Sequence, residues 1–353
     1  MISNRQNPLQ AITRYAGHAV RRRRNLSCDL PGGCDLLDGM RRALPLFIFF
    51  CAGALLAPAQ VRFTRHDNSV DVEVGGRPFT SFYFGAAAPK PYLHPLLTAD
   101  GVRLTRLYPM DAKDPNSHDH PHHRGLWFAH GDVNGIDFWA SEPDQRVGKQ
   151  GLIVLKEIVE TQDGAKSGKL HVLLEWQDPK GKAMVTEDRT MTFSGDDKVR
   201  SIDFDITLSV PSKTVFGDTK EGLFAIRLRD ELTEEKGSGL MTNAQGKTGM
   251  KQIWGGRSEW VDYAGKVEGH KLGIAIFDHP GNPHYPTWWH ARDYGLFASN
   301  PFGEKDFTGD KSKNGSVTVE AGKSLRFRFR VLIHPDDTAT AGIGAAWKAW
   351  SAR

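Results

Sequence analysis

Cysteine is nearly absent from this 353-residue chain, and its three cysteines, Cys28, Cys34 and Cys51, all lie near the N-terminus. If the chain is cut after residue 59, as argued below, the remainder has no disulfide, no thiol nucleophile and no thiolate metal ligand. An exported protein without disulfides depends on its hydrophobic core. About 290 residues are enough for this, because a chain of that length buries roughly three-quarters of its unfolded surface.

Long apolar runs and an excess of charge are also missing after residue 60. No later stretch reaches the ~20 apolar residues that span a bilayer. Residues 1–59 hold 8 of the 46 Lys and Arg residues but only 3 of the 42 Asp and Glu residues, so the remainder is close to neutral. The sequence therefore argues against a multi-span membrane protein and a nucleic-acid binder. It also lacks the G-x-S-x-G, G-x-x-x-x-G-K-[ST] and H-E-x-x-H motifs.

The first 59 residues predict a leader. Met40-Arg41-Arg42 precedes an apolar run over 43–56, which ends in Ala57-Pro58-Ala59. A positive segment, an apolar segment and an A-x-A site form a secretory signal peptide, and the run is too short to span a bilayer. We expect translation to start at Met40, cleavage after Ala59, and a periplasmic or secreted protein. The alternative is an uncleaved N-terminal anchor.

Alternation of apolar and polar residues dominates the rest of the chain and predicts β-strands. The expected strands cover 70–74, 102–108, 151–160, 171–175, 198–208, 272–277 and 324–333, and 317–333 reads as a late hairpin. One helix is expected over 338–350, with Trp347 and Trp350 packed on a sheet. The pattern predicts an all-β fold, a large antiparallel two-sheet β-sandwich with a short C-terminal helix. We expect residues 60–353 to form a single domain; the alternative is two smaller β domains that divide near residue 212.

The densest group of chemically useful side chains lies between residues 118 and 130. If a strand begins at His122, alternation places His122, Arg124 and His130 on one face and His123 and Trp127 on the other. Histidine serves as acid or base near neutral pH, and arginine binds carboxylates or polarises carbonyl groups. This pattern indicates a substrate-binding surface.

The same segment allows a metal site as an alternative. His118, His120 and His122 alternate around Asp119, and imidazoles with a carboxylate can bind zinc or iron. Pro121 interrupts this pattern, and H-x-H-x-H is not a diagnostic spacing. We therefore expect no cofactor, and expect His118 and His120 to form hydrogen bonds within a loop.

Two further segments carry polar side chains on one strand face. In 221–229, alternation sets Glu221, Arg227 and Arg229 opposite an apolar face. In 288–292, Trp288, His290 and Arg292 share a face, with Trp289 on the other side in the core. Aromatic rings that stack on the C–H faces of a sugar, beside groups that reach its hydroxyls, are typical of carbohydrate sites.

Four strings carry a resemblance to a known family: H-P-H-H-R-G-L-W at 120–127, G-I-D-F-W at 135–139, W-H-A-R-D-Y-G-L at 289–296 and N-P-F-G at 300–303. Over roughly residues 65–345 the chain resembles a bacterial family of unknown function labelled "methane oxygenase PmoA". A methane monooxygenase subunit would need several membrane spans, which this chain lacks after residue 60. The strand pattern is also similar to the supersandwich fold of aldose mutarotases and some polysaccharide lyases, a similarity of architecture only.

These observations predict an exported acid/base enzyme that acts on a sugar or glycoside, of the epimerase, mutarotase, lyase or hydrolase type. The alternatives are a metal-dependent hydrolase or oxygenase and a non-catalytic carbohydrate-binding protein. The expected proton donors are His122, His130 or His290, and the expected base is Glu221. The expected substrate-binding residues are His123, Arg124, Trp127, Trp139, Arg227, Trp288, Arg292 and Asn300.

The leader gives a first testable prediction. When the full chain is expressed in a bacterium, the exported protein should begin at Gln60, because the signal peptidase site follows Ala59. Mass spectrometry of the N-terminal peptide from the periplasm or medium measures this directly. An intact leader on membrane-bound protein would support the anchor instead.

Overall fold

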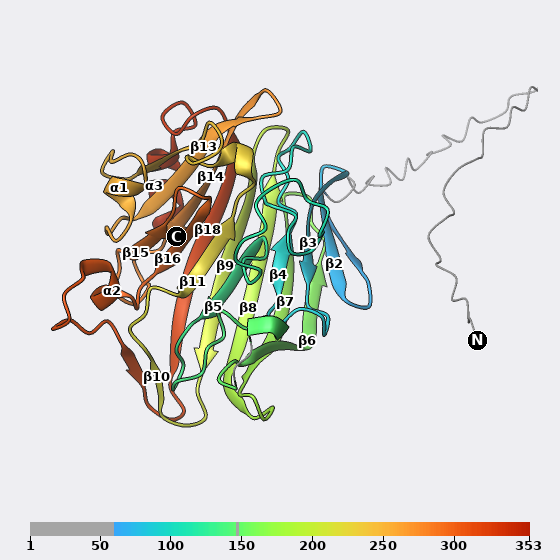
Figure 1. Cartoon of the computed structure of the whole chain (residues 1–353). Helices are drawn as coiled ribbons and strands as arrows, with labels where there is room; N and C mark the ends of the chain where they lie inside the picture. Colours follow the sequence, from blue (N-terminus) through green and yellow to red (C-terminus); the bar gives the residue numbers. More distant parts are fainter. Residues whose placement is uncertain (1–59, 146–147) are drawn as a thin grey trace, which may run out of the picture. The chain divides into compact units, whose positions relative to one another are not determined.

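The computed structural model describes residues 60–145 and 148–353, whose strands form two eight-stranded antiparallel sheets and one two-stranded ribbon (Figure 1). The predicted fold class, an antiparallel two-sheet sandwich with a short C-terminal helix, is confirmed. The signal peptide, the start at Met40 and the cleavage after Ala59 all concern residues outside the described ones.

The first sheet has the strand order β1-β2-β3-β4-β5-β11-β16-β15. Its strands are β1 Val61–Arg65, β2 Ser69–Val74, β3 Arg77–Tyr83, β4 Tyr92–His94, β5 Leu126–His130, β11 Gly222–Arg227, β16 Leu296–Asn300 and β15 Trp288–Ala291. Segments far apart in sequence therefore become neighbours in its second half. This half carries the three polar segments that the sequence singles out.

The second sheet has the order β12-β13-β14-β18-β9-β8-β7-β6. Its strands are β12 Leu240–Asn243, β13 Trp260–Val267, β14 His270–Asp278, β18 Ser324–Pro335, β9 Arg200–Ser209, β8 Ala183–Gly195, β7 Ser167–Gln177 and β6 Leu152–Gln162. A two-stranded ribbon pairs β10 Thr214–Phe216 with β17 Val317–Val319. The helices are α1 Met250–Ile253, α2 Glu304–Thr308 and α3 Ile343–Ser351, with 3₁₀ turns at η1 Pro143–Gln145 and η2 Asp230–Leu232.

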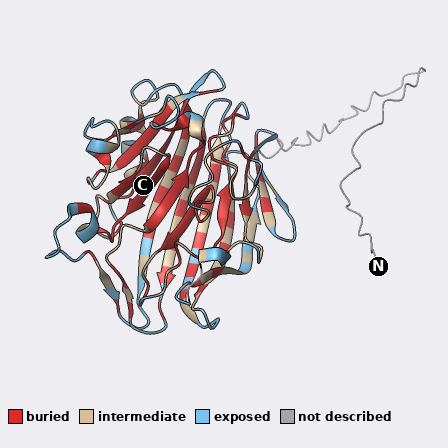
Figure 2. Cartoon of the chain, viewed as in Figure 1, coloured by how far each residue is buried: buried red, intermediate tan, exposed pale blue. Residues whose placement is uncertain are grey.

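Aromatic side chains from both sheets fill the space between them, where the strands are mostly buried (Figure 2). Phe224 of β11 stacks on Phe329 of β18 with ring centroids 4.5 Å apart, and contacts Phe204 of β9 at 4.8 Å. Phe128 of β5 contacts Trp176 of β7 at 6.0 Å. Since successive strand residues point to opposite faces, the neighbours of Phe128 and Phe224 face away from the second sheet.

The alternation of apolar residues locates most of the strands correctly, with two exceptions. The expected strand at 102–108 forms only isolated bridges, Arg103 with Leu97 and Thr105 with Leu228. Val102 and Leu104 are buried as they would be in a strand. The backbone, however, pairs with one segment at Arg103 and with another at Thr105. The expected hairpin over 317–333 is also wrong, because Val317–Val319 pairs with β10 while β18 pairs with β14 and β9.

The C-terminal helix packs on the second sheet as the spacing of its tryptophans predicts. Trp350 is buried, and its ring lies 6.0 Å from that of Phe277 on β14. The indole N–H of Trp347 donates to the carbonyl of Asp278. Both tryptophans therefore serve the core rather than a ligand site.

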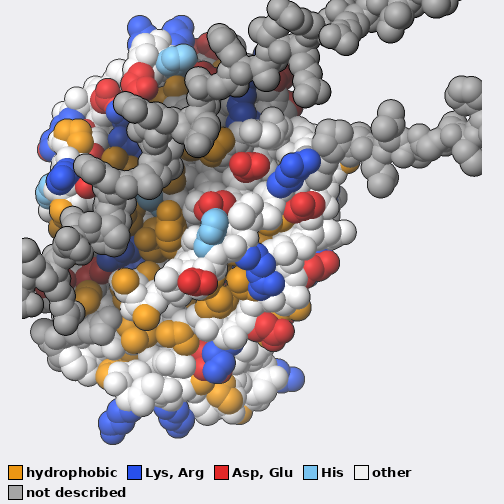
Figure 3. All heavy atoms as spheres, turned by 90° about the vertical axis from the view of Figure 1, so that its right-hand side faces the viewer, with side chains coloured by type: hydrophobic (Ala, Val, Ile, Leu, Met, Phe, Trp, Pro, Cys, Tyr) orange, Lys and Arg blue, Asp and Glu red, His pale blue; other side chains and the backbone are white. Residues whose placement is uncertain are grey.

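Charge is mixed over the surface of the described residues. On the face in Figure 3, acidic and basic side chains are interspersed with apolar ones and do not gather by sign. Among these residues, no helix has the length and apolar character needed to cross a bilayer.

The aromatic contact between the sheets leads to a prediction about stability. Phe224→Ala should lower the free energy of unfolding by about 3–5 kcal/mol, because it removes a fully buried ring and leaves a cavity. Urea denaturation followed by tryptophan fluorescence measures this change. Val159→Ala is the control, since Val159 is exposed on β6 and should cost less than about 0.5 kcal/mol. A similar loss in both variants would mean that this contact does not join the sheets.

Candidate functional site

A row of four residues runs across β5, β11, β16 and β15 on the face of the first sheet that points away from the second. Trp127 pairs with Ala225, Ala225 with Ala298, and Ala298 with His290. The two alanines leave room between the larger side chains at either end.

His290, at one end of this row, lines a cavity of about 460 Å³, a volume within the range of small-molecule sites. The cavity unites the three polar segments that are separate in the sequence. The residues that line it are His120, His122, His123, Trp139, Ala140, Lys220, Glu221, His290, Arg292, Tyr294 and Leu296. The predicted convergence of these segments is therefore present in the structure.

Two buried arginines hold the histidine loop against the sheet. Arg227 of β11 approaches Asp119 with a nitrogen–oxygen distance of 2.7 Å, and Arg106 binds the same carboxylate at 2.5 Å. Arg106 also donates to the carbonyls of Ser117 and His120. Both guanidinium groups are fully buried. Burial by itself would raise the pKa of Asp119. The hydrogen bonds and positive charges around the carboxylate outweigh this effect and hold its pKa far below the usual range.

The rings on this side of the pocket form a column. His123 lies between Trp127, at 5.2 Å, and His120, at 4.7 Å, and all three rings are nearly parallel. Tyr294 lies beside this column, with its ring 5.2 Å from that of His120 and 6.5 Å from that of His123. Trp139 meets the edge of the column, with its ring 6.0 Å from that of His123. The pocket wall is therefore largely aromatic.

His290, on β15, has one ring nitrogen that is fixed and one that is available. Its Nδ1 lies 3.0 Å from the carbonyl oxygen of Lys220. A carbonyl only accepts hydrogen bonds, so Nδ1 carries the proton and Nε2 of the neutral ring is a free base. Burial lowers the pKa of His290 to about 4, although the charge of Glu221 opposes this shift. At neutral pH His290 can accept a proton, whereas the sequence analysis expects it to donate one.

Burial is the largest cause of the shifted pKa values of His122, His123 and Tyr294 in the pocket and of Lys90 beside it. Burial, with the positive charge of Lys90, lowers the pKa of His122 to about 3, and burial lowers that of His123 well below its usual value. Burial raises the pKa of Tyr294 to about 12, so its hydroxyl keeps its proton at neutral pH. Lys90 itself is buried behind the wall, donates to the carbonyl of Trp139, and has its pKa lowered by burial to about 8.

His130 does not line the pocket, contrary to its expected place beside His122. The strand begins only at Leu126, after Gly125 with a φ of 55°, so alternation does not extend back to His122. His130 is consequently on the same side as Phe128, within the sandwich, where its ring contacts Phe302. Its Nε2 donates to the carbonyl of Gly217, and a Cβ at Gly222 would lie 2.6 Å from its Nδ1.

Several expected binding residues support the pocket without lining it. Arg227 lies beneath Tyr294, with its guanidinium carbon 4.6 Å from the ring centroid. The side-chain amide of Asn300 donates to the carbonyl of Thr219 and accepts from the N–H of Phe302. Its nitrogen and its oxygen are therefore both hydrogen-bonded to backbone groups. Trp127 lies behind His123.

Arg124, Trp288 and Arg229 point elsewhere. Arg124 forms two hydrogen bonds with Glu142, of 2.8 and 2.7 Å, and is not among the lining residues. Trp288 shares a face with His290 as predicted, but stacks on Phe307 instead of entering the cavity. Arg229 is paired with Glu231 and Glu268.

The four residues of the alternative metal site do not form a group that could hold a metal. Asp119 is held by two arginines, and Nε2 of His118 lies 2.7 Å from the carbonyl of Asp114 within its own loop, as expected. Nδ1 of His120 lies 3.4 Å from Asp119 of the same loop, and the His120 ring also stacks in the wall of the pocket. Within residues 60–145 and 148–353, no group of three or more His, Cys, Asp or Glu side chains has a geometry that could hold a metal.

Lys220 and Tyr294 line the pocket but are not among the site residues that the sequence predicts. Tyr294 follows Trp288, His290 and Arg292 at the same two-residue spacing, and that parity could have revealed it. Lys220 precedes the strand that contains Arg227, and nothing in the pattern marks it. In the structure it forms an ion pair with Glu221.

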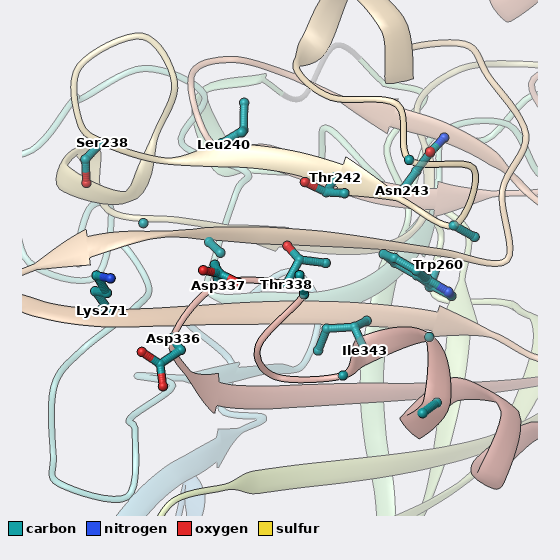
Figure 4. Close-up of a pocket in the computed structure, with 18 of the residues that line it drawn as sticks. Ser238, Leu240, Thr242, Asn243, Trp260, Lys271, Asp336, Asp337, Thr338 and Ile343 are labelled. Carbon is teal, nitrogen blue, oxygen red and sulfur yellow. The ribbon is translucent and has the colours of Figure 1, made fainter.

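A second cavity, of about 850 Å³, lies on the other sheet beside β12 and β13 (Figure 4). Leu240, Trp260 and Ile343 give it a mainly apolar lining, with Lys271 and Asp336 at its edge. No histidine is found among the described residues that line it. It is larger than the histidine pocket, and its ionisable lining groups are Lys266, Lys271, Asp336 and Asp337.

Comparisons with known proteins give one family and several distant structures. Residues 69–348 match the family described as "Family of unknown function (DUF6807)". That description contains no methane oxygenase activity. No curated protein matches the sequence.

The similar solved structures include a galactose mutarotase-like protein from Lactobacillus casei, with 10% identity and a TM-score of 0.37 over 78% of this chain and 100% of that one. A galactose 1-epimerase from Lactobacillus acidophilus has 10% identity and a TM-score of 0.36 over 79% and 100%. A GH36 alpha-galactosidase from Geobacillus stearothermophilus has 9% identity and a TM-score of 0.34 over 78% and 41%. These distant similarities establish no activity for this chain.

The pairing of Asp119 leads to a second prediction about stability. Asp119→Asn should lower the free energy of unfolding by about 2 kcal/mol, because two buried guanidinium groups lose their shared anion. Chemical denaturation at neutral pH gives the value. Asp205→Asn is a matched control, since its pair with Arg326 is exposed and should contribute less than about 1 kcal/mol. Equal losses in the two variants would show that the loop is held in another way.

Proposed function

Because this chain belongs to DUF6807, a family of unknown function, we propose its activity from the pocket itself: an exported enzyme that acts on a sugar by acid/base chemistry. The reaction is of the isomerase, lyase or glycoside-cleaving type and uses no nucleotide cofactor. The observation that carries this proposal is His290, a neutral imidazole with its Nε2 free, in the same cavity as the carboxylate of Glu221.

His290 is the proton acceptor in this proposal. Its Nδ1 is held by the carbonyl of Lys220, which fixes the tautomer and the plane of the ring. Glu221 lies in the same cavity and favours the protonated form of His290 through its charge. Glu221 therefore partly offsets the burial that disfavours the protonated ring.

Tyr294 and the aromatic wall complete the arrangement. The hydroxyl of Tyr294 keeps its proton at neutral pH and can donate a hydrogen bond to a substrate oxygen. Trp139 offers an apolar surface of the kind on which the C–H faces of a sugar ring stack. The combination of an apolar wall with a few convergent polar groups is typical of a small-molecule site.

Replacing the proposed base should abolish most of the turnover. Conversion of aldoses, sugar acids and simple glycosides can be followed by proton NMR spectroscopy, which detects epimers, eliminated products and released sugars in one measurement. On any substrate found, His290→Ala should lower kcat/KM at least ~10²-fold, because general base catalysis contributes that much or more. Glu221→Gln should lower it as well.

The matched control is His171→Ala, on β7 of the second sheet, which should leave turnover unchanged. With native protein, kcat/KM should rise with pH through about 4, as Nε2 of His290 loses its proton, and stay level towards neutrality. Full turnover in both His290→Ala and Glu221→Gln would refute the mechanism. Sugar binding that survives both changes, with no product from the native protein, would identify a non-catalytic carbohydrate-binding protein.

A further inference from the structure

Positive charge exceeds negative charge around the histidine pocket. Of the charged groups that line it, Lys220 is paired with Glu221, while Arg292 has no carboxylate within ion-pair distance among the described residues. The Nε of Arg292 is buried and makes no hydrogen bond to a described residue. Arg292 therefore brings an uncompensated charge and unused donors to the pocket.

The groups beneath the pocket add to this excess. Arg106 and Arg227 are both fully buried and share the single carboxylate of Asp119, which leaves one positive charge over. Tyr294 lies between two guanidinium groups, with that of Arg227 at 4.6 Å and that of Arg292 at 5.4 Å from its ring centroid. Burying positive charge without a counterion is costly, so an anion that enters the pocket would be stabilised.

The buried imidazoles of the pocket do not balance the excess positive charge, and they do not add to it. His122, His123 and His290 are buried and neutral, and each can only donate or accept hydrogen bonds. A neutral lining with one free guanidinium suits a ligand that has hydroxyls and a single anionic group. Arginine is the residue best suited to a carboxylate, because its planar fork can bind both oxygens.

We propose that the pocket takes a sugar acid, and that Arg292 binds the carboxylate of this ligand. This proposal rests on the proposed function, because it takes the ligand to be a sugar. It adds that the sugar carries a carboxylate and that Arg292 selects it. Arg292 is thus a specificity-determining residue, while His290 is the acid/base group.

Isothermal titration calorimetry tests this without requiring turnover. The probes are D-galacturonate and D-glucuronate, against the matched neutral sugars D-galactose and D-glucose, and D-galactose 6-phosphate as a second anion. At least one sugar acid should bind 10-fold or more tightly than its neutral counterpart. Arg292→Met should weaken sugar-acid binding roughly 10- to 100-fold, the loss expected for charge-assisted hydrogen bonds, and change neutral-sugar binding less than about 3-fold.

Arg326→Met is the control, because Arg326 lies on β18 in an exposed pair with Asp205 and should leave all affinities unchanged. Equal affinity of both sugar acids and their neutral counterparts, failure of every sugar acid to bind, or unchanged sugar-acid affinity in Arg292→Met would overturn the proposal. Tighter binding of the sugar phosphate would refute the choice of a carboxylate. Sugar-acid binding without any product would contradict the proposed enzymatic function but not the choice of ligand. Turnover of neutral sugars without a preference for sugar acids would contradict the choice of ligand but not the enzymatic function.

Discussion

The site depends on one ionic interaction, the carboxylate of Asp119 between the guanidinium groups of Arg106 and Arg227. Asp119 belongs to the histidine loop and Arg227 to β11, so this contact fixes the loop on the sheet. Arg106 adds hydrogen bonds to two backbone carbonyls of the same loop. Contacts of Ser117 with Asp230 and of Gln145 with His122 support the same loop.

The same interaction sets the electrostatics of the pocket. The two arginines bring two positive charges beneath it and Asp119 cancels only one, so protonation of the nearby imidazoles is disfavoured beyond the effect of burial. The charge of a histidine usually depends on small changes in pH or in its surroundings near neutrality. Here the buried imidazoles are held neutral. The pocket thus combines neutral imidazoles, which can accept protons, with a positive electrostatic potential that favours an anion. The same cluster of charges contributes to both properties.

The sequence predicts much of the fold, and fails where the backbone leaves regular alternation. The faces of β11 and β15 are predicted correctly, because these strands are regular over the residues concerned. His130 is misplaced because Gly125 adopts a left-handed conformation and the strand starts after it, which a two-residue period cannot anticipate. The role of Arg106 is missed because the segment 102–108 alternates like a strand, whereas its side chain serves a loop that follows in sequence. The pairing of β17 with β10 joins residues about 100 positions apart, and no local pattern encodes it.

The most direct test of the account is the response of the histidine side chains to a ligand, observed by NMR spectroscopy of protein labelled with ¹⁵N in its imidazoles. The account predicts that His290 is neutral at pH 7 with its proton on Nδ1. Added D-galacturonate should shift the signals of His120, His122 and His290 but not those of His66 and His171, which lie outside the cavity. A charged His290, or ligand-induced shifts confined to histidines outside the pocket, would contradict the central claim that these imidazoles form one binding site.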